Sequence, residues 1–479
     1  MRKPYPMDPL IAKPAREIVA LLKAGQVTPG ELIDAAEARI QAVDGKLNAL
    51  PTLCMDRARD AARKMTPPVA GAPGWLAGLP IAIKDLNNVA GVRTTFGSPI
   101  FADNISETSD IPVETLERNG ALVIAKSNTP EFGAGANTFN EVFGATRNPW
   151  NTDLTCGGSS GGAAVAVATG QVWLATGSDL GGSLRTPASF CSVVGLRPSP
   201  GRIARSGPNP FDTLGVIGPM ARDVRDVALL LDAMAGRHVG DVLSLADAPA
   251  PFLAAAEAPK LPKKVAFSAD LGCLPVDPEI ADICRRAAEK LASQGVQVEE
   301  VSPDFSGAGE TFQTLRAAAF AGRHADLMAA HPGKFKPEIV WNTEKGLALT
   351  AGEIASAEAA RGALIARVGK FLGEYDLLLC PAAPVAPFDV TIRYVEEIGD
   401  TRMDNYIEWI AITYCITLTA CPALSLPAGF SSNGLPVGMQ LIAANGEEAR
   451  LLAHASAMEE LFAVSDGLPI DPKIGDIPA

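Results

Sequence analysis

The chain has 479 residues, of which 47% are hydrophobic, and it carries a formal net charge of −13 at pH 7. Its length suggests two or three domains, although single large α/β sheets also reach this size, and its apolar content supplies ample core. The acidic balance argues against direct nucleic-acid binding, and the lack of 18 uninterrupted apolar residues argues against a membrane span.

The predicted elements begin with helices over residues 14–64, where Thr28 and Glu31 form a capping box. A loop rich in proline and glycine follows at 66–76. Apolar runs then predict buried strands, the first of which ends at Lys84. In chain order, the elements expected up to the middle of the chain are strands at 79–83, 121–125 and 172–176, and helices at 161–169 and from Asp223 to Gly236.

The second half of the chain continues the alternation of strands and helices. It predicts strands at 264–268, 376–380, 424–426 and 437–442, helices at 277–293, 311–331, 352–373 and 447–462, and a helical or mixed segment at 402–418. Such alternation is typical of a mainly parallel sheet that is covered on both faces. We therefore predict an α/β protein. The Ala- and Pro-rich residues 247–263 are interpreted as a linker or a surface connection.

The eight cysteines are scattered along the chain without a C-x-x-C pair. This pattern fits neither a disulfide framework nor a zinc site. The N-terminal sequence MRKPYPMDPL also lacks the apolar core of a signal peptide. From these observations we expect a cytoplasmic protein with reduced thiols.

Two glycine-flanked serines stand out between residues 156 and 191. Ser159 lies inside GGSSGG, and Ser183 closes GSDLGGS just before a predicted helix. A serine in such a turn is suited to nucleophilic attack if a base takes its proton. GGSSGG lacks the lysine that a P-loop needs. A Ser-His-Asp triad, with one of four histidines folding back, remains an alternative.

Lys84 is the candidate base. A lysine accepts a proton only when it is neutral, and the apolar strand before Lys84 supplies the desolvation that lowers a lysine pKa. A surface lysine at a strand end is the alternative. A serine of the GGSSGG pair is suited to relay the proton, because a hydroxyl both donates and accepts, but the residues alone do not choose between Ser159 and Ser160.

Attack by Ser183 on a carbonyl would create an oxyanion that needs preorganised donors. The three residues before it supply candidate backbone N–H groups, namely Leu180, Gly181 and Gly182. Asp179 and Arg185 flank the same turn, and we expect this pair to lock the loop. Binding of a substrate carboxylate by Arg185 is the alternative.

These segments together resemble the amidase signature family. The resemblance rests on GLPIAIKD, GGSSGG, GSDLGGSLRTPASFCSVVGLRPSPGR and GPMARDVRDVALLLDAMAG, and more loosely on PALSLPAGFSSNGLPVGMQLI. It covers residues 14–236 closely and 376–462 loosely. It implies one three-layer α/β/α domain over residues 1–479, built around a mixed, mainly parallel sheet, with residues 1–70 as a helical segment packed on it.

The resemblance also implies an amidohydrolase that works through a serine acyl-enzyme. Ser183 would be the nucleophile, Ser159 the bridging serine after a cis peptide from Gly158, and Lys84 the base, with Ser160 supporting the site. No metal and no organic cofactor are implied. Small departures from the family pattern flank the site, at Cys156, Ala163 and Ser192.

Substrate specificity in this family lies in variable segments, which here are residues 306–350 and 381–412, with 95–98 and 131–135 as further candidates. Aromatic and apolar residues of these segments would line an acyl or aryl pocket, namely Trp341, Met403, Tyr394, Tyr406 and Trp409; plain core positions are the alternative. We expect a small-molecule substrate, an apolar or aryl amide, with esters and carbamates also open. A homodimer is a candidate assembly.

Two rival functions remain beside a free amidase. One is the amidase subunit of a tRNA-dependent amidotransferase, which releases ammonia from glutamine. That subunit usually has glutamine after the arginine of its serine loop, where this chain has Thr186. The other rival is a catalytically silent binding protein with the same fold, against which the intact Lys84, Ser159 and Ser183 argue.

Overall fold

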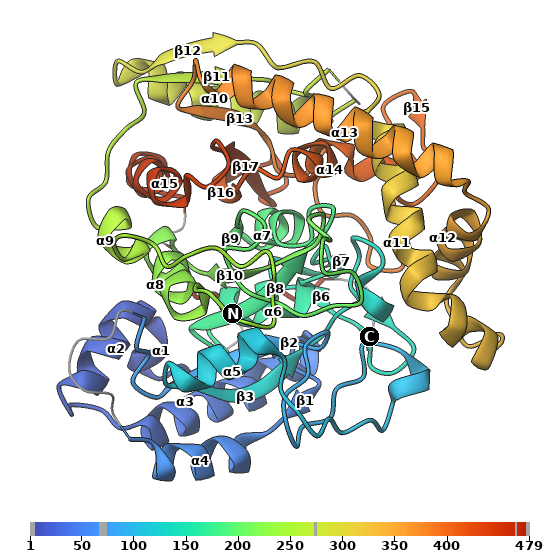
Figure 1. Ribbon diagram of the computed structural model, residues 1–479. Coiled ribbons are helices and arrows are strands. Elements are labelled where there is room, and N and C mark those ends of the chain that lie inside the picture. The colour runs from blue at the N-terminus through green and yellow to red at the C-terminus, as the bar shows by residue number, and fades with distance from the viewer. Residues whose placement is uncertain (1–4, 67–73, 273–274, 465–466, 476–479) are drawn as a thin grey trace.

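The computed structural model describes residues 5–66, 74–272, 275–464 and 467–475, and in these residues a mixed sheet of 11 strands is covered by helices (Figure 1). Across the sheet the strands are β1 (Thr52–Leu53), β3 (Ala121–Ser127), β2 (Leu79–Lys84), β8 (Leu174–Asp179), β10 (Val216–Ala221), β9 (Val194–Arg197), β16 (Ala423–Phe430), β17 (Pro436–Ile442), β13 (Leu377–Pro381), β11 (Lys264–Phe267) and β12 (Gln297–Glu300). Short hairpins outside the sheet pair β4 (Phe139–Asn140) with β5 (Gly144–Ala145), β6 (Arg147–Asn148) with β7 (Asn151–Thr155), and β14 (Glu397–Ile398) with β15 (Thr401–Arg402).

The helices follow the chain from the blue N-terminal layer of Figure 1 to the red C-terminal end. They are α1 (Pro9–Ala12), α2 (Ala15–Lys23), α3 (Pro29–Val43), α4 (Met55–Lys64), α5 (Ile111–Arg118), α6 (Gly161–Ala168), α7 (Arg185–Cys191), α8 (Val224–Met234), α9 (Phe252–Ala256), α10 (Pro278–Ser293), α11 (Ala308–Ala330), α12 (Pro337–Leu347), α13 (Ala351–Leu372), α14 (Ala411–Leu418) and α15 (Glu448–Phe462). Single 3-10 turns lie at Asp44–Lys46, Pro99–Phe101, Glu131–Gly133 and Glu408–Ile410. The predicted capping box between Thr28 and Glu31 opens α3.

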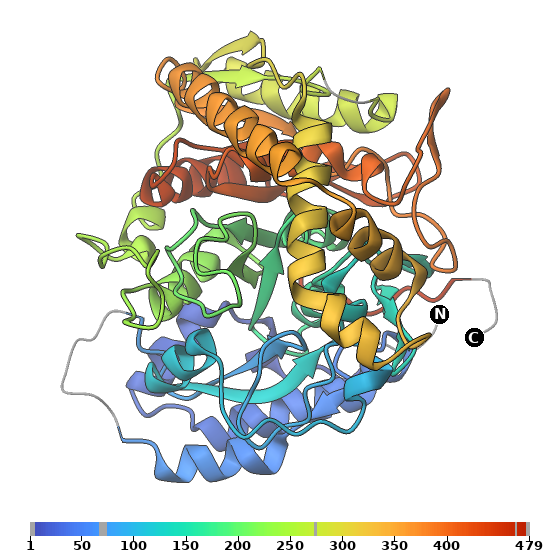
Figure 2. The same cartoon turned by 45° about the vertical axis from the view of Figure 1, so that its right-hand side comes forward.

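Both faces of the sheet are buried. The side chains of β13 alternate between two hydrophobic clusters, with Leu377 and Leu379 in one and Leu378 and Cys380 in the other. Because successive strand side chains point to opposite faces, this alternation places apolar layers above and below the sheet. Turning the view by 45° brings α11 forward, where it packs against α12 and α13 (Figure 2).

The predicted large mixed α/β sheet is confirmed, and its parallel pairings lie in two outer blocks. β2 is parallel to β3 and β8, and β11 is parallel to β12 and β13. The central strands β10, β9, β16 and β17 pair in antiparallel fashion. The alternation of elements did not predict this centre, because parallel neighbours need a long crossover whereas β16 and β17 are joined by a short turn.

The elements that the sequence did not predict are short or follow weak patterns. They include β9, β10, α5 and α12, and the mixed segment 402–418 resolves into a hairpin strand, a 3-10 turn and α14. The proposed linker 247–263 contains α9, which packs against α8 and α15 and so forms a structured connection. Most of the predicted loop 66–76 lies outside the described residues. Within the described part of the chain, no helix is both long and apolar enough to cross a bilayer.

Candidate active site

Parallel strands bring the predicted base and the serine loop to one edge of the sheet. β2 ends at Lys84 and β8 ends at Asp179, and the two strands run parallel. Because the carboxyl ends of parallel strands meet at the same edge, residues far apart in sequence become neighbours there. Ser159 and Ser160 precede α6, and Ser183 precedes α7. The site is therefore built from two strand ends and two loops that lead into helices.

Lys84 is entirely buried among hydroxyl groups. Its Nζ lies 2.7 Å from Ser159 Oγ, 2.9 Å from Ser160 Oγ and 3.0 Å from Ser178 Oγ. Burial lowers the pKa of Lys84 to about 7, against the opposing effect of the Asp179 charge. The alternative of a surface lysine is wrong. Burial thus favours the neutral form of this amine, which is the form that accepts a proton.

The hydrogen bonds of the two neighbouring serines separate their roles. Ser160 Oγ donates its hydrogen to the carbonyl oxygen of Ser178 (3.2 Å) and accepts the N–H of that residue (3.2 Å). The remaining contact of Ser160 is therefore acceptance from Lys84 Nζ. Ser159 makes no such hydrogen bonds with Ser178, and it lines a cavity. This difference favours Ser159 over Ser160 as the candidate relay.

The last two glycines of GGSSGG leave no room for a Cβ atom. The peptide bond between Gly158 and Ser159 is cis, in agreement with the family pattern. A Cβ at Gly162 would lie 2.4 Å from the backbone nitrogen of Asn128. Glycine is thus required here because α6 starts directly against a neighbouring loop, which fixes the position of the serines that precede it.

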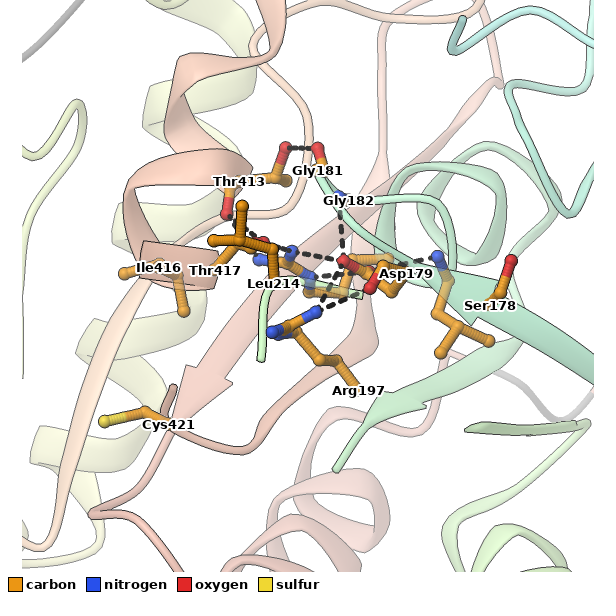
Figure 3. Close-up of polar contacts among 12 residues, drawn as sticks. Ser178, Asp179, Gly181, Gly182, Arg197, Leu214, Thr413, Ile416, Thr417 and Cys421 are labelled. Atoms are coloured by element: carbon orange, nitrogen blue, oxygen red, sulfur yellow. Dashed lines mark hydrogen bonds and ion pairs between the residues drawn. The ribbon is translucent and has the colours of Figure 1, made fainter. Parts of the chain in front are cut away.

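The loop that carries Ser183 is fixed by a buried ion-pair network. Asp179 Oδ1 lies 2.8 Å from Arg185 Nη2 and 3.4 Å from Arg197 Nη1, and all three side chains are fully buried. Burial by itself would raise the pKa of Asp179, but the two guanidinium groups hold it well below its usual range. Figure 3 shows Asp179 between Arg197 and the Gly182 turn. Arg185 lies against Asp179 and contacts Thr413 and Gln440. Its guanidinium is therefore paired with groups of the protein itself.

The predicted oxyanion donors differ in their availability. The N–H of Gly182 donates to Asp179 Oδ1 (2.9 Å), so this donor is directed into the ion-pair network and not toward a substrate. The carbonyl oxygen of Gly181 accepts from Thr413 Oγ1 (2.6 Å), which fixes the orientation of the preceding turn. We therefore retain Leu180 and Gly181 as proposed donors.

Replacement of Gly182 by alanine is expected to destabilise the protein by about 1–3 kcal/mol and to lower its activity. Gly182 has φ +116°, and a Cβ there would lie 2.4 Å from Thr413 Oγ1, which belongs to the support of the same loop. Thermal unfolding and kcat/KM would measure the two effects. Gly322→Ala is the matched control, because no atom lies within 4 Å of its Cβ position in α11 and alanine favours a helix. Equal behaviour of the two variants would contradict this account of the loop.

A cavity of about 270 Å³ opens beside the serines. Its polar end is formed by Ser159, Ser178 and Ser183, of which Ser178 and Ser183 are partly exposed and Ser159 is buried. Its apolar wall comes from four separate parts of the chain, with the side chains Leu86, Phe132, Phe312, Phe320, Ile407 and Ile410. The cavity thus places a partly exposed serine hydroxyl in an enclosed, largely apolar space.

The proposed pocket residues have separate outcomes. Tyr406 lines the cavity. Trp341 and Tyr394 line a different, more open groove that only shares Tyr406 with it. Trp409 and Met403 are core residues, as their neighbours are other buried apolar side chains. Aromatic content alone did not predict which rings face the cavity, because that depends on the turn and hairpin that precede α14.

Sequence reasoning missed two groups of site residues. Ser178 contacts Lys84, and its signal is the two-residue spacing from Thr176, whose Oγ1 accepts the backbone N–H of Lys84 (3.2 Å). Side chains two apart on a strand share a face. The second group is the cavity wall on α11, which lies inside the variable segment 306–350 expected to set specificity, although none of its residues was named individually. Across the residues described, no three His, Cys, Asp or Glu side chains are arranged to hold a metal ion.

Comparisons with known proteins show which proteins this chain is similar to. A family model described as Amidase matches residues 31–452. An acylamidase of Rhodococcus erythropolis is 34% identical over 469 residues, which covers 95% of this chain and 97% of the relative. A glutamyl-tRNA(Gln) amidotransferase subunit from Thermus thermophilus is 37% identical over 473 residues, or 94% of this chain and 97% of the relative. Among solved structures, a bacterial aryl acylamidase of the amidase signature family matches with a TM-score of 0.88 at 28% identity, covering 97% of this chain and 100% of that chain.

Proposed function

The chain belongs to the amidase family, and from this membership we propose that it is an amidohydrolase that cleaves a carboxylic amide through a serine acyl-enzyme. One observation carries the proposed mechanism. A fully buried lysine with its pKa lowered to about 7 lies 2.7 Å from Ser159 Oγ, at a cavity that also contains Ser183. This arrangement supplies a neutral base, a relay and a nucleophile in an enclosed space.

In the proposed acylation step, Ser183 Oγ attacks the amide carbon as its proton moves to Ser159 Oγ, and the Ser159 proton moves to the neutral Nζ of Lys84. The oxyanion accepts hydrogen bonds from the N–H groups of Leu180 and Gly181. The same relay then returns a proton to the amide nitrogen, because an unprotonated amine is a very poor leaving group. The C–N bond breaks, and the amine leaves with the proton.

In the proposed deacylation step, water replaces the amine. It attacks the acyl carbon while its proton passes through Ser159 to Lys84, and the proton then returns to Ser183 as the ester bond breaks. The products are a carboxylic acid and the restored enzyme. Lys84 is thus base and acid in turn, which requires a pKa near the working pH.

The apolar cavity wall supports apolar or aryl amides as the substrate class. Leu86, Phe132 and Phe312 would contact a hydrocarbon or ring next to the scissile bond. The names of two relatives, an acylamidase and an aryl acylamidase, support the same class. Esters and carbamates remain proposed alternatives, since their carbonyl groups are open to the same attack.

A hydrolysis screen is the test of this function. The panel contains aliphatic amides, anilides, cyclic amides, carbamates, esters and glutamine, each assayed by product formation with Ser183→Ala as the control. We expect anilides or apolar aliphatic amides to give the highest kcat/KM and the variant to give none above background. Turnover of none of these compounds, with tight binding of some, would favour a silent binding protein instead.

A second candidate function is supported by the sequence similarity to the amidotransferase subunit from Thermus thermophilus. In that case glutamine would be the preferred substrate in the screen, and a second protein chain would co-purify with this one. Thr186, in place of the usual glutamine after Arg185, argues for the free amidase. If the protein released ammonia from glutamine and hydrolysed no other compound of the panel, we would prefer the amidotransferase subunit to the free amidase.

The proposed location is the cytoplasm, and the proposed assembly is a homodimer. The location is supported by thiols without disulfide partners at Cys54, Cys156, Cys191, Cys284 and Cys421. Size-exclusion chromatography with light scattering would test the assembly, and a monomeric mass would contradict it.

A further inference from the structure

One buried arginine in the cavity wall has no acidic partner. Arg316 on α11 is 5% exposed and lines the cavity. Its Nη1 donates to Tyr406 Oη (2.7 Å), and its guanidinium lies over the Phe320 ring, 4.1 Å from the centroid. In the part of the chain that the structure describes, no carboxylate lies within ion-pair distance of Arg316. A guanidinium stays charged in proteins, so this site holds a desolvated cation without a counter-ion.

The neighbouring charges do not supply that counter-ion. Arg205 and Arg323 also line the cavity. Both form ion pairs with Asp212, at 3.1 Å for Arg205 and 2.6 Å for Arg323. Two of the three arginines that line the cavity therefore share one carboxylate, and Arg316 does not take part in that ion-pair group. Removal of a buried charge from water is costly unless an opposite charge or hydrogen bonds replace the water. A bound anion would provide both.

Besides Asp179, the acidic residue that lines the cavity is Asp110. Its carboxylate accepts hydrogen bonds from the side chains of Asn87 and Asn88 and from the backbone of Asn88. It forms no ion pair with Arg316. The cavity therefore has an excess of positive charge at α11, although the whole chain is acidic with a net charge of −13.

Arg316 lies on the same helix as a residue that contacts the serine loop. Phe312 lies one helical turn before it on the same face of α11, and the Phe312 ring is 3.3 Å from the Cβ position of Gly181 in the serine loop. One turn of helix advances by about 5.4 Å. Arg316 therefore lies about one helical turn beyond the ring that contacts the serine loop, and it lines the same cavity as Leu180, Gly181 and Ser183.

We propose that Arg316 binds a carboxylate of the substrate, so that this enzyme prefers amides with an acidic group a few bonds from the scissile carbonyl. This inference rests on the proposed amidohydrolase function and narrows its substrate class. Tyr406 is the positioning residue, because its hydroxyl holds one side of the guanidinium and leaves the other N–H groups for the bidentate contact that carboxylates make with arginine. The apolar wall contacts the chain or ring between the two ends.

The test compares acidic amides with neutral amides of the same shape. One pair is glutaryl-4-nitroanilide and 5-methylhexanoyl-4-nitroanilide, with the carboxylate on the acyl side. The other is 4-acetamidobenzoate and 4-isopropylacetanilide, with the carboxylate on the amine side. We expect kcat/KM to favour the acidic member of at least one pair by roughly 10- to 100-fold, as for a hydrogen bond to a charged group. Arg316→Gln should bring this ratio close to one.

Two further variants control the experiment. Arg402→Gln removes a charge from an exposed strand outside the cavity and should keep the wild-type ratio. Tyr406→Phe removes the positioning hydroxyl and should lower the ratio in part, which tests the inference even if Arg316→Gln does not fold. A ratio near one in the wild type, or a high ratio that Arg316→Gln and Tyr406→Phe leave unchanged, would overturn the inference while the amidohydrolase function stands.

Failure of the function itself has a different signature. If the wild type cleaves no amide of either pair, calorimetric titration of 4-acetamidobenzoate into wild type and Arg316→Gln still measures the carboxylate contact. Binding that weakens about tenfold or more in the variant would support the anion site. Equal binding, or no binding to either, would overturn it.

Discussion

Replacement of Ser183 by alanine is expected to lower kcat/KM for the best amide by at least about 10⁴-fold. The variant loses the atom that would form the acyl-enzyme, and the hydroxyl of the almost buried Ser159 is not placed to replace it. The fold should remain intact, because Ser183 is partly exposed and its loop is held by Asp179, not by its own side chain. Steady-state kinetics with a chromogenic anilide would give the loss, and thermal unfolding would verify the fold.

A covalent probe makes the same prediction independent of the substrate. A fluorophosphonate should modify the wild type once, and peptide mass spectrometry should place the adduct on Ser183. Ser206→Ala is the matched control, since this exposed serine also borders the cavity and has no proposed role in the reaction. Retained activity in Ser183→Ala, or an adduct on Ser159 or Ser178, would show that the nucleophile is assigned incorrectly.

The fold was predictable where local patterns are strong. The capping box at Thr28 gave the start of α3, and the continuous apolar runs gave β2 and β3 within one or two residues. The antiparallel centre was not predictable, because β9 and β10 are short and no helix lies between them. Local periodicity does not contain the register of such strands, which depends on contacts between distant segments.

The candidate site was predictable in its motifs and not in its surroundings. The resemblance to a family assigned Lys84, Ser159 and Ser183, whereas the residues alone left Ser160 as an equal alternative to Ser159. The hydrogen bond of Ser160 to the Ser178 carbonyl distinguishes them, and it depends on how β8 passes α6. The cavity wall on α11 belongs to the segment 306–350 that the resemblance assigned to specificity, but α11 lies more than 120 residues after Ser183, and sequence spacing did not predict which of its residues contact the cavity.

The loop network and the base are electrostatically connected. The Asp179 charge raises the pKa of Lys84, in opposition to burial. Arg185 and Arg197 lie against the same carboxylate and offset its charge. The ion pairs that fix the Ser183 loop therefore also limit how strongly Asp179 would keep Lys84 protonated. This arrangement explains how a lysine can remain a base close to a buried aspartate.

Replacement of Lys84 by methionine is expected to lower kcat/KM by about 10²- to 10⁴-fold and to remove its pH dependence near neutrality. Methionine fills a similar volume, so the buried site keeps its packing, but it accepts no proton. In the wild type, Lys84 is protonated below its pKa of about 7 and neutral above it, and only the neutral form is a base. The value of kcat/KM should therefore rise about tenfold per pH unit below that pKa and level off above it.

Lys336 provides the control that makes this pH profile specific. Its side chain is half-buried, and desolvation lowers its pKa to about 8. Its Nζ contacts the carbonyl oxygen of Ala134, and it does not line the cavity. In Lys336→Met the rise of kcat/KM should keep its midpoint near pH 7, since the free-enzyme profile reports the groups that act on the substrate. If the midpoint moves with Lys336, or if it persists in Lys84→Met, then Lys84 is not the group that takes the proton. The serine relay would in that case need another base, and the buried amine beside Ser159 would have only a structural role.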